Sequence, residues 1–180
     1  MSGFVLWFTG LPAAGKTTVG SLVARELEAR GQTVEVLDGD VVRTHLSQGL
    51  GYSKEDRDTN IRRIGWVSSR LARAGAAVVV SAISPYEEAR RRARALVEEH
   101  APFVEIHVAT PLEVCAERDP KGLYAKARAG EITGMTGVDD PYEVPTDADL
   151  TLDTSDTSAN VAATRVLDHL AAAGWIDARR

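Results

Sequence analysis

The chain has one cysteine, Cys115, among its 180 residues and no apolar run near the ~20 residues of a transmembrane helix. A lone cysteine forms no disulfide within the chain, which favours a reducing compartment, and we expect Cys115 to be a buried small hydrophobe. The apolar N-terminal segment lacks the basic region of a signal peptide. We therefore expect an intracellular, cytoplasmic protein.

Positive charge is also scarce, since 21 Lys and Arg residues stand against 26 Asp and Glu, for a net charge of −5. Nucleic acids and membrane surfaces attract basic faces, so this balance argues against both as partners. No repeat, low-complexity tract or linker composition interrupts the sequence. We expect a single domain over residues 1–180 with one well-buried core.

A phosphate-loop motif follows the apolar run FVLWF at 4–8. Its pattern, G-x-x-x-x-G-K-T, belongs between a strand and a helix whose free N–H groups hold polyphosphate oxygens. Lys16 then reaches the β- and γ-phosphates, and Thr17 offers its hydroxyl to Mg²⁺. The motif predicts a nucleoside triphosphate site. The predicted loop comprises Gly10, Leu11, Pro12, Ala13, Ala14, Gly15, Lys16, Thr17 and Thr18.

Apolar runs rich in β-branched residues alternate with helical patterns along the chain. The predicted strands are 4–9, 33–37, 77–81, 103–108 and 150–152. The predicted helices are 16–30, 54–74, 86–100 and 158–173. This alternation predicts an α/β fold of the P-loop NTPase type, a three-layer sandwich around a mostly parallel sheet, with ligands at the carboxyl ends of the strands.

Residues 118–144 carry no strong core pattern and are rich in Gly, Asp, Lys and Arg. A long polar segment inside a compact domain is either disordered or functional. Its charges and glycines favour a mobile lid that closes over the phosphate site and excludes water.

Two carboxylates, Asp38 and Asp40, follow the second predicted strand. At that edge of the sheet they can bind Mg²⁺ or act as a base, and the alternative is a solvated turn around Gly39. The strand at 77–81 ends without an aspartate. We therefore assign the carboxylate chemistry to Asp38 and Asp40, with Thr17 and Asp40 as the predicted metal ligands.

Arg57 and Asn60 fall one turn before Ile61 and Ile64 on the apolar stripe of the second predicted helix. We expect them at the open end of a buried seam, where a guanidinium suits an oxyanion and an amide suits a ribose or base edge. Other basic side chains are expected to be solvated or structural. The solvated set is Arg62, Arg63, Arg90, Arg91, Arg92 and Arg94, and the structural histidines are His45, His100, His107 and His169.

Longer stretches of the sequence resemble the adenylylsulfate kinase (APS kinase) family. The matching strings are GLPAAGKTT at 10–18, DGDVVR at 38–43, LGYSKEDRDTNIRRIG at 50–65, ISPY at 83–86, PLEVCAERDPKGLY at 111–124 and ARAGEITGMTGVDDPYE at 127–143. They occur in family order over nearly the whole chain. The resemblance implies transfer of the γ-phosphoryl of ATP to the 3′-hydroxyl of adenylyl sulfate, with Mg²⁺, by a homodimer linked in function to an ATP sulfurylase.

The resemblance also implies roles for individual residues. Lys16, Asp40 and Ser84 form the catalytic set, in which Asp40 orients or deprotonates the hydroxyl. Ser84 matches a serine sometimes assigned as a phosphorylated intermediate, but without an adjacent base a substrate contact is the better expectation. Arg118 and Thr154 would flank the ATP adenine. The implied substrate-binding set is Asp38, Asp40, Arg43, Tyr52, Arg57, Asn60, Ile83, Ser84, Lys121, Gly122, Leu123, Met135 and Thr136.

The sequence departs from the family where Pro12 and Ala13 replace Ser-Gly, and where Tyr52 and Met135 replace phenylalanine. These changes leave the defining loop residues intact but alter contacts near the phosphates and the bases. Two alternatives remain open. One is a kinase of another small nucleotide, such as a cytidine diphosphate derivative, and the other is a nucleotide-binding regulator without catalysis.

Overall fold

The computed structural model describes residues 3–177, so the first two and last three residues of the predicted domain lie outside the described residues. The strands are β1 (Phe4–Thr9), β2 (Val34–Asp38), β3 (Ala77–Ser81), β4 (Phe103–Val108) and β5 (Leu150–Leu152). The helices are α1 (Lys16–Ala29), α2 (Gly39–His45), α3 (Lys54–Arg73), α4 (Glu87–Glu98), α5 (Leu112–Arg118), α6 (Leu123–Arg128) and α7 (Ala159–Ala172). Over these residues, no helix combines the length and the apolar composition that crossing a bilayer requires.

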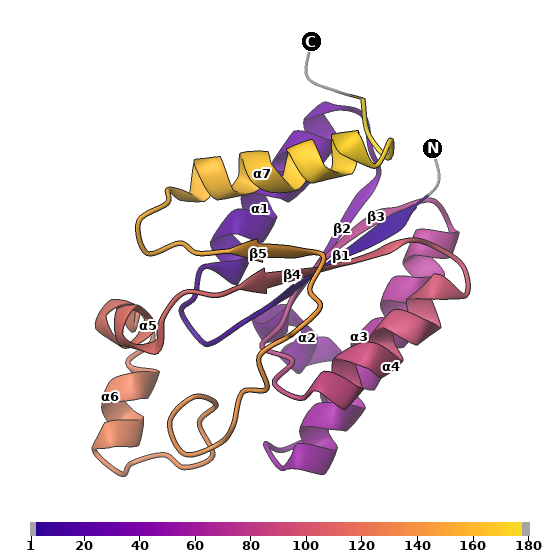
Figure 1. Ribbon diagram of the computed structural model, residues 1–180. Helices are drawn as coiled ribbons and strands as arrows, with labels where there is room; N and C mark the ends of the chain where they lie inside the picture. Colours follow the sequence, from indigo (N-terminus) through magenta and orange to yellow (C-terminus); the bar gives the residue numbers. More distant parts are fainter. Residues whose placement is uncertain (1–2, 178–180) are drawn as a thin grey trace.

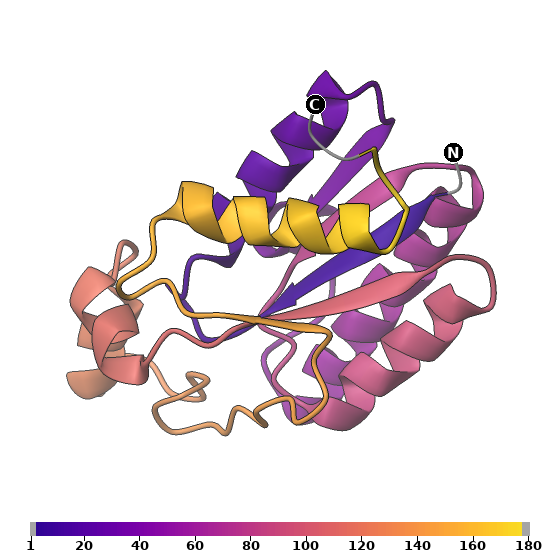
Figure 2. The same ribbon diagram turned by 45° about the horizontal axis from the view of Figure 1, so that its top comes forward.

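The strands form one parallel sheet in the order β2-β3-β1-β4-β5. Helices α1 and α7 cover one face of the sheet, and α3 and α4 cover the other (Figures 1 and 2). The predicted three-layer α/β fold is confirmed. The order in which strands are added to the sheet reverses around β1, because β2 and β3 lie on one side of it and β4 and β5 lie on the other. In open parallel sheets this switch point is where ligands bind.

Strand β1 is buried on both of its faces. Its side chains alternate, so that Phe4, Leu6 and Phe8 join the core under α1 and α7, while Val5 and Trp7 join the core under α3 and α4. Each of these five side chains is at most 1% exposed. A continuous apolar run of this kind is typical of an inner parallel strand.

Three short helices were not predicted from the sequence, namely α2, α5 and α6. Each has six or seven residues, too few for a periodic apolar pattern to stand out. Helix α2 begins because the Asp38 carboxylate accepts a hydrogen bond from the backbone N–H of Asp40 and caps it. Strand β2 is also shifted by one residue, to Val34–Asp38.

The segment 118–144 is structured, so the disorder alternative is wrong for it. It contains α6 and a turn at 134–140, in which the Asp139 carboxylate accepts hydrogen bonds from the N–H groups of Gly134 and Met135 at 2.7 Å. These bonds to the charged form lower the pKa of Asp139. Tyr124 is also fully buried, so the segment contributes to the core. Its closing motion stays a prediction.

The expectation of a solvated position is wrong for Arg90. It lies on the same stripe of α4 as Ala89, Ala93 and Val97 and is 1% exposed. Its Nε lies 2.8 Å from Oε1 of Glu105 on β4, and this pairing is what permits a guanidinium in the core. The rest of the helix is mixed: Arg91 and Arg92 are solvated as expected, whereas the side chain of Arg94 is only 26% exposed.

Helices α3 and α4 approach closely at Gly65. A Cβ on Gly65 would lie 3.0 Å from the Cα and Cβ of Ala93, closer than ordinary packing allows. An alanine there requires Ala93 to move away by a few tenths of an ångström, and we expect this overpacking to outweigh the gain in helix propensity.

We expect Gly65→Ala to lower the free energy of unfolding by about 1–3 kcal/mol. Urea denaturation monitored by circular dichroism measures the change. The exposed residue Arg62 on the same helix gives a control, since Arg62→Ala should stay within about 0.5 kcal/mol of the wild type. An unchanged or increased stability of Gly65→Ala would contradict the close approach of α3 and α4.

Candidate functional site

The loop after β1 is tied to its neighbours by backbone contacts that leave little room for side chains. Gly15 has φ 105°, and a Cβ there would lie 3.2 Å from Oγ1 of Thr154. The Ala14 carbonyl accepts hydrogen bonds from the hydroxyls of Thr110 and Thr154, at 2.9 and 2.8 Å. Ala13 has φ 61°, an uncommon conformation for a residue other than glycine, and such conformations persist where the surroundings fix them.

Further contacts hold this loop from the segment after β4. The Tyr124 hydroxyl donates to the Pro12 carbonyl at 2.9 Å. Arg118 donates to both Oγ1 and the carbonyl oxygen of Thr154, which places its guanidinium beside the loop. Neither Tyr124 nor Thr110 was singled out from the sequence, because these contacts join residues about 100 positions apart and leave no local pattern.

Lys16, the first residue of α1, folds back over its own loop. Its Nζ donates to the carbonyls of Gly10 and Leu11 at 2.9 and 2.8 Å, and the residue is 8% exposed. Burial lowers the pKa of the Lys16 ammonium from its ordinary value of 10.5 to about 8, although Cys115 and Asp38 oppose the shift. A charge that has lost its water in this way gains strongly from an incoming anion.

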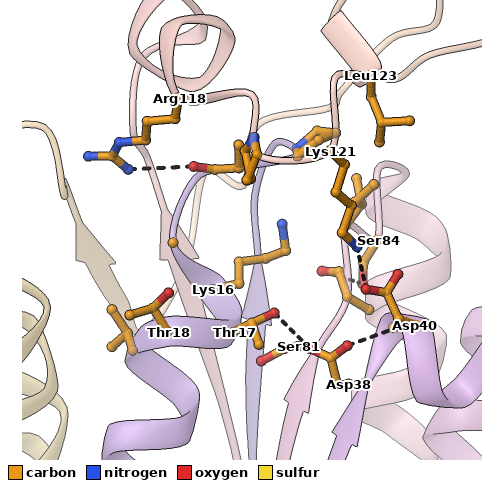
Figure 3. A pocket seen from close by; sticks show the side chains of 18 of the residues that line it. Lys16, Thr17, Thr18, Asp38, Asp40, Ser81, Ser84, Arg118, Lys121 and Leu123 are labelled. Atoms are coloured by element: carbon orange, nitrogen blue, oxygen red, sulfur yellow. Dashed lines mark hydrogen bonds and ion pairs between the residues drawn. The ribbon is translucent and has the colours of Figure 1, made fainter.

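Thr17 and Asp38 meet at the foot of the loop. The Thr17 hydroxyl donates to Oδ2 of Asp38 at 2.7 Å, and Oδ1 of Asp38 accepts from the Asp40 N–H at 3.0 Å (Figure 3). A hydroxyl and a carboxylate side by side beneath a phosphate loop fit Mg²⁺, which usually binds one or two protein oxygens together with phosphates and waters. The oxygen next to Thr17 therefore belongs to Asp38, not to the predicted ligand Asp40.

Asp40 faces a different partner, Lys121, which extends toward it from the segment 118–144 (Figure 3). The two side chains are 73% and 58% exposed. An ion pair that is so exposed contributes little to stability, because water screens it and two flexible side chains are ordered. It can therefore be exchanged readily when another charged group arrives.

Arg57 and Asn60 lie at the open end of the seam under α3, as predicted, and are 9% and 8% exposed. The Arg57 guanidinium donates to Thr136 Oγ1 and to the Gly134 carbonyl, and it lies 3.4 Å from the Asp140 carboxylate. Three residues of the turn at 134–140 therefore already occupy this arginine.

Asn60 and Tyr52 make fewer polar contacts than Arg57 does. Asn60 Oδ1 accepts from the Ser47 hydroxyl at 2.5 Å. Tyr52 is 68% exposed, and the Arg43 guanidinium lies 4.1 Å from the centre of its ring. The Arg57 guanidinium lies 6.0 Å from the same ring centre, and an exposed aromatic ring beside two arginines can stack on a base without losing its cation–π contact.

The Ser84 hydroxyl is turned into the core. It accepts a hydrogen bond from the indole N–H of Trp7 at 3.0 Å, and Ser84 is 1% exposed. The backbone at Ser84 has φ 49°, and Ser84 lines the cavity together with Ile83. A buried hydroxyl that is engaged by an indole, with no general base beside it, is poorly placed to act as a nucleophile.

One cavity of about 860 Å³ brings most of the predicted residues together. Among the predicted residues it is lined by Pro12, Ala13, Gly15, Lys16, Thr17, Thr18, Asp38, Asp40, Arg43, Tyr52, Arg57, Asn60, Ile83, Ser84, Arg118, Lys121, Leu123 and Thr154. The remaining predicted residues, which do not line it, are Gly10, Leu11, Ala14, Gly122, Met135 and Thr136. Of these, Met135 and Thr136 are 7% and 2% exposed, so the turn at 134–140 encloses them.

The lowered pKa of Lys16 makes stability depend on pH in a defined direction. Between about pH 8 and pH 10.5 the unfolded chain holds the Lys16 proton while the folded protein has released it. The free energy of unfolding of the wild type should therefore rise with pH across this window, relative to Lys16→Met, by on the order of 2 kcal/mol. Urea unfolding of both proteins at several pH values measures this, and a constant difference would show that Lys16 is not buried as described.

Comparisons with known proteins agree on one family. The family model described as adenylylsulphate kinase matches residues 2–153. An adenylyl-sulfate kinase of Picosynechococcus sp. is 52% identical over 174 residues, which are 97% of each chain. A probable bifunctional SAT/APS kinase of Sorangium cellulosum is 51% identical over 99% of this chain, which spans only 30% of that longer protein.

A solved structure agrees as well. It is that of the Mycobacterium tuberculosis APS kinase CysC in complex with AMPPNP and APS. This structure superposes with a TM-score of 0.91 at 47% identity, over 94% of this chain and 98% of the other. On these matches, and with the phosphate loop, the carboxylates and the arginines gathered around one cavity, the chain belongs to the adenylylsulfate kinase family.

Proposed function

We propose that the chain is a kinase that transfers the γ-phosphoryl of ATP to the 3′-hydroxyl of adenylyl sulfate, giving 3′-phosphoadenylyl sulfate and ADP. The observation that carries this is the lining of the cavity. It includes residues of the phosphate loop together with two arginines, an asparagine and an exposed tyrosine, which are Arg43, Arg57, Asn60 and Tyr52. Its volume of about 860 Å³ lies in the upper range of ligand pockets, as a site for two nucleotides requires.

The donor half is the loop after β1 with Lys16. The backbone N–H groups at the start of α1 and the Lys16 ammonium hold the phosphates of ATP. When ATP binds, the Lys16 ammonium exchanges its hydrogen bonds to the carbonyls of Gly10 and Leu11 for contacts with the charged phosphates. Arg118 and Thr154, which sit together beside the loop, flank the adenine.

Mg²⁺ accompanies ATP and neutralises charge on its phosphates. Thr17 and Asp38 are the residues that fit it, because a hydroxyl and a carboxylate lie 2.7 Å apart directly below the phosphate loop. Asp40 then remains for the acceptor and orients or deprotonates its hydroxyl. Asp40 takes this role once Lys121 has released its carboxylate.

The acceptor half lies against α3. Arg43, Arg57 and Asn60 bind the sulfate-bearing nucleotide, and Tyr52 stacks on its adenine. Ile83 and Ser84 line the cavity beside them. Since the Ser84 hydroxyl is held by Trp7, we propose direct transfer between the two nucleotides without a phosphoserine.

Phosphoryl transfer asks a protein mainly for positioning and for neutralisation of charge. Both halves supply this, with the lysine and the metal site on one side and the arginines on the other. The lid, made by the segment 118–144 with Lys121, Gly122, Leu123, Met135 and Thr136, closes over the reactants. Exclusion of water then strengthens every charge interaction inside the site.

The wider setting is part of the proposal. We propose that the chain acts as one kinase domain in a homodimer, supplied by a sulfurylase that makes adenylyl sulfate. The single cysteine, which is buried, supports a cytoplasmic location. Light scattering of the purified protein tests the oligomeric state.

The test is transfer of radiolabelled γ-phosphoryl from ATP, with adenylyl sulfate, AMP and a cytidine diphosphate derivative offered in parallel. We expect turnover with adenylyl sulfate that depends on Mg²⁺. In Lys16→Ala we expect a loss of about 100- to 1,000-fold with unchanged circular dichroism, because Lys16 lies at a loop end. ATP binding without turnover on adenylyl sulfate would refute the proposal, and turnover on the cytidine compound alone would favour the alternative kinase.

Arg57 distinguishes the two halves of the cavity. Arg57→Ala should raise the KM for adenylyl sulfate by about 10- to 100-fold, the effect of losing charged hydrogen bonds, and change the KM for ATP far less. The solvated residue Arg62, on the same helix, supplies the control variant Arg62→Ala. Equal effects of Arg57→Ala on both KM values would show that Arg57 does not belong to the acceptor half of the cavity.

A further inference from the structure

Arg90 is a buried arginine for which the site described above has no role. It lies on α4, and its side chain is 1% exposed. Its counter-ion Glu105 lies on β4 with a side chain that is 8% exposed, and Nε and Oε1 are 2.8 Å apart. Arginine keeps its charge under all ordinary conditions, so a guanidinium in this place is held by its partners.

The other two guanidinium nitrogens of Arg90 reach two separate segments. Nη1 donates to the Ser84 carbonyl at 2.8 Å, and Nη2 donates to the Glu143 carbonyl at 2.8 Å. Ser84 belongs to the wall of the cavity, and Glu143 lies at the C-terminal end of the segment 118–144. One side chain therefore fastens the sheet, the cavity wall and the end of the predicted lid together.

The backbone at Ser84 needs such an anchor. Its φ of 49° lies in a region that residues other than glycine rarely adopt, and such conformations persist only where neighbouring groups determine them. The Ser84 hydroxyl accepts a hydrogen bond from the Trp7 indole N–H, which fixes the side chain as well. Arg90 and Trp7 together hold Ser84 in place.

The end of the lid is joined to the same wall by direct contacts. The Glu143 N–H donates to the Pro85 carbonyl at 2.8 Å, and the Glu143 carboxylate accepts from the Glu87 N–H at 2.6 Å. The neighbouring Tyr142 hydroxyl lies 2.9 Å from Oγ1 of Thr9 at the end of β1. The guanidinium of Arg90 lies beside these contacts, 5.9 Å from the centre of the Tyr142 ring.

We propose that Arg90, with Glu105 as its counter-ion, is a positioning residue for the acceptor nucleotide. It sets the backbone of residues 83–85 against the acceptor and anchors the C-terminal end of the lid to that wall. Arg90 itself lines no part of the main cavity. This inference rests on the proposed function for the identity of the acceptor, adenylyl sulfate.

The geometry requires arginine at this position. Its planar fork presents three nitrogens in fixed directions, whereas lysine offers one compact ammonium on a flexible stem. Arg90→Lys keeps the positive charge for Glu105 but cannot reach the carbonyls of Ser84 and Glu143 together. The solvated residue Arg92, with a side chain 67% exposed on the same helix, supplies the matched control Arg92→Lys.

The first measurement is steady-state kinetics of the wild type, Arg90→Lys and Arg92→Lys. We expect Arg90→Lys to raise the KM for adenylyl sulfate about tenfold and to leave the KM for ATP within about twofold. Arg92→Lys should match the wild type. An unchanged KM for adenylyl sulfate in Arg90→Lys, or equal rises for both substrates, overturns the proposal.

The second measurement needs no activity and follows the indole ¹⁵N–¹H resonance of Trp7, assigned with Trp7→Phe. Because this N–H donates to the Ser84 hydroxyl, its shift should move in Arg90→Lys while those of Trp66 and Trp175 stay constant. An unmoved Trp7 resonance overturns the proposal. If Arg90→Lys does not fold, Glu105→Gln replaces it and should move the same resonance and the same KM.

The two measurements separate this inference from the proposed function. A wild type that binds ATP but does not phosphorylate adenylyl sulfate refutes the proposed function and the role of Arg90 toward that acceptor. Arg90 would then be only the structural anchor that the Trp7 resonance reports. A wild type with full activity, beside an Arg90→Lys variant with unchanged kinetics, refutes the inference about Arg90 alone.

Discussion

Burial of β1 on both faces is the constraint that organises this molecule. The strand packs Phe8 into one core and Trp7 into the other, so its carboxyl end has no freedom to shift. The loop that follows starts from a fixed point, and two threonine hydroxyls hold its Ala14 carbonyl from the far side. A loop fastened at both ends can keep Ala13 in an uncommon conformation and hold Lys16 ready for an anion.

Charged groups around the cavity already have partners within the chain. Lys16 is bonded to its own loop, Asp40 is paired with Lys121, and Arg57 is bonded to the turn at 134–140. A buried charge without a partner would be costly, so the contacts of Lys16 and Arg57 stabilise the protein in the absence of nucleotides, whereas the exposed pair of Asp40 and Lys121 adds little. Under the proposed function, each substrate exchanges one set of charge contacts for another, and net affinity reflects the difference between the two.

The sheet and the four long helices could be predicted because their apolar periodicity extends over many residues. The helices α2, α5 and α6 could not, since each has only six or seven residues, too few for an apolar period to stand out. Strand order brought Lys16, Thr17 and the two aspartates to one edge, as the sequence indicated. The choice of Asp38 over Asp40 as the neighbour of Thr17 depends on where α2 begins, which no pattern in the sequence showed.

Arg90 is a different case, because the sequence around it carries one pattern that indicates burial and another that indicates a solvated face. Its position at the spacing of Ala89, Ala93 and Val97 marks it as part of the buried stripe, yet a run of arginines among glutamates is typical of a solvated face. The counter-ion on β4 decides between the two readings, and only the fold brings Glu105 to α4. Contacts such as Tyr124 with Pro12 were beyond prediction for the same reason.

The pairing of Lys121 with Asp40 has a consequence for side reactions. A kinase that holds ATP without its acceptor risks hydrolysis, in which a water molecule takes the place of the hydroxyl. While the Lys121 ammonium donates a hydrogen bond to Oδ2 of Asp40, that oxygen is occupied and is less available to orient the water. Under the proposed function, ATP that binds alone thus meets a base that is engaged elsewhere, and the nucleotide is spared until the acceptor displaces the lysine.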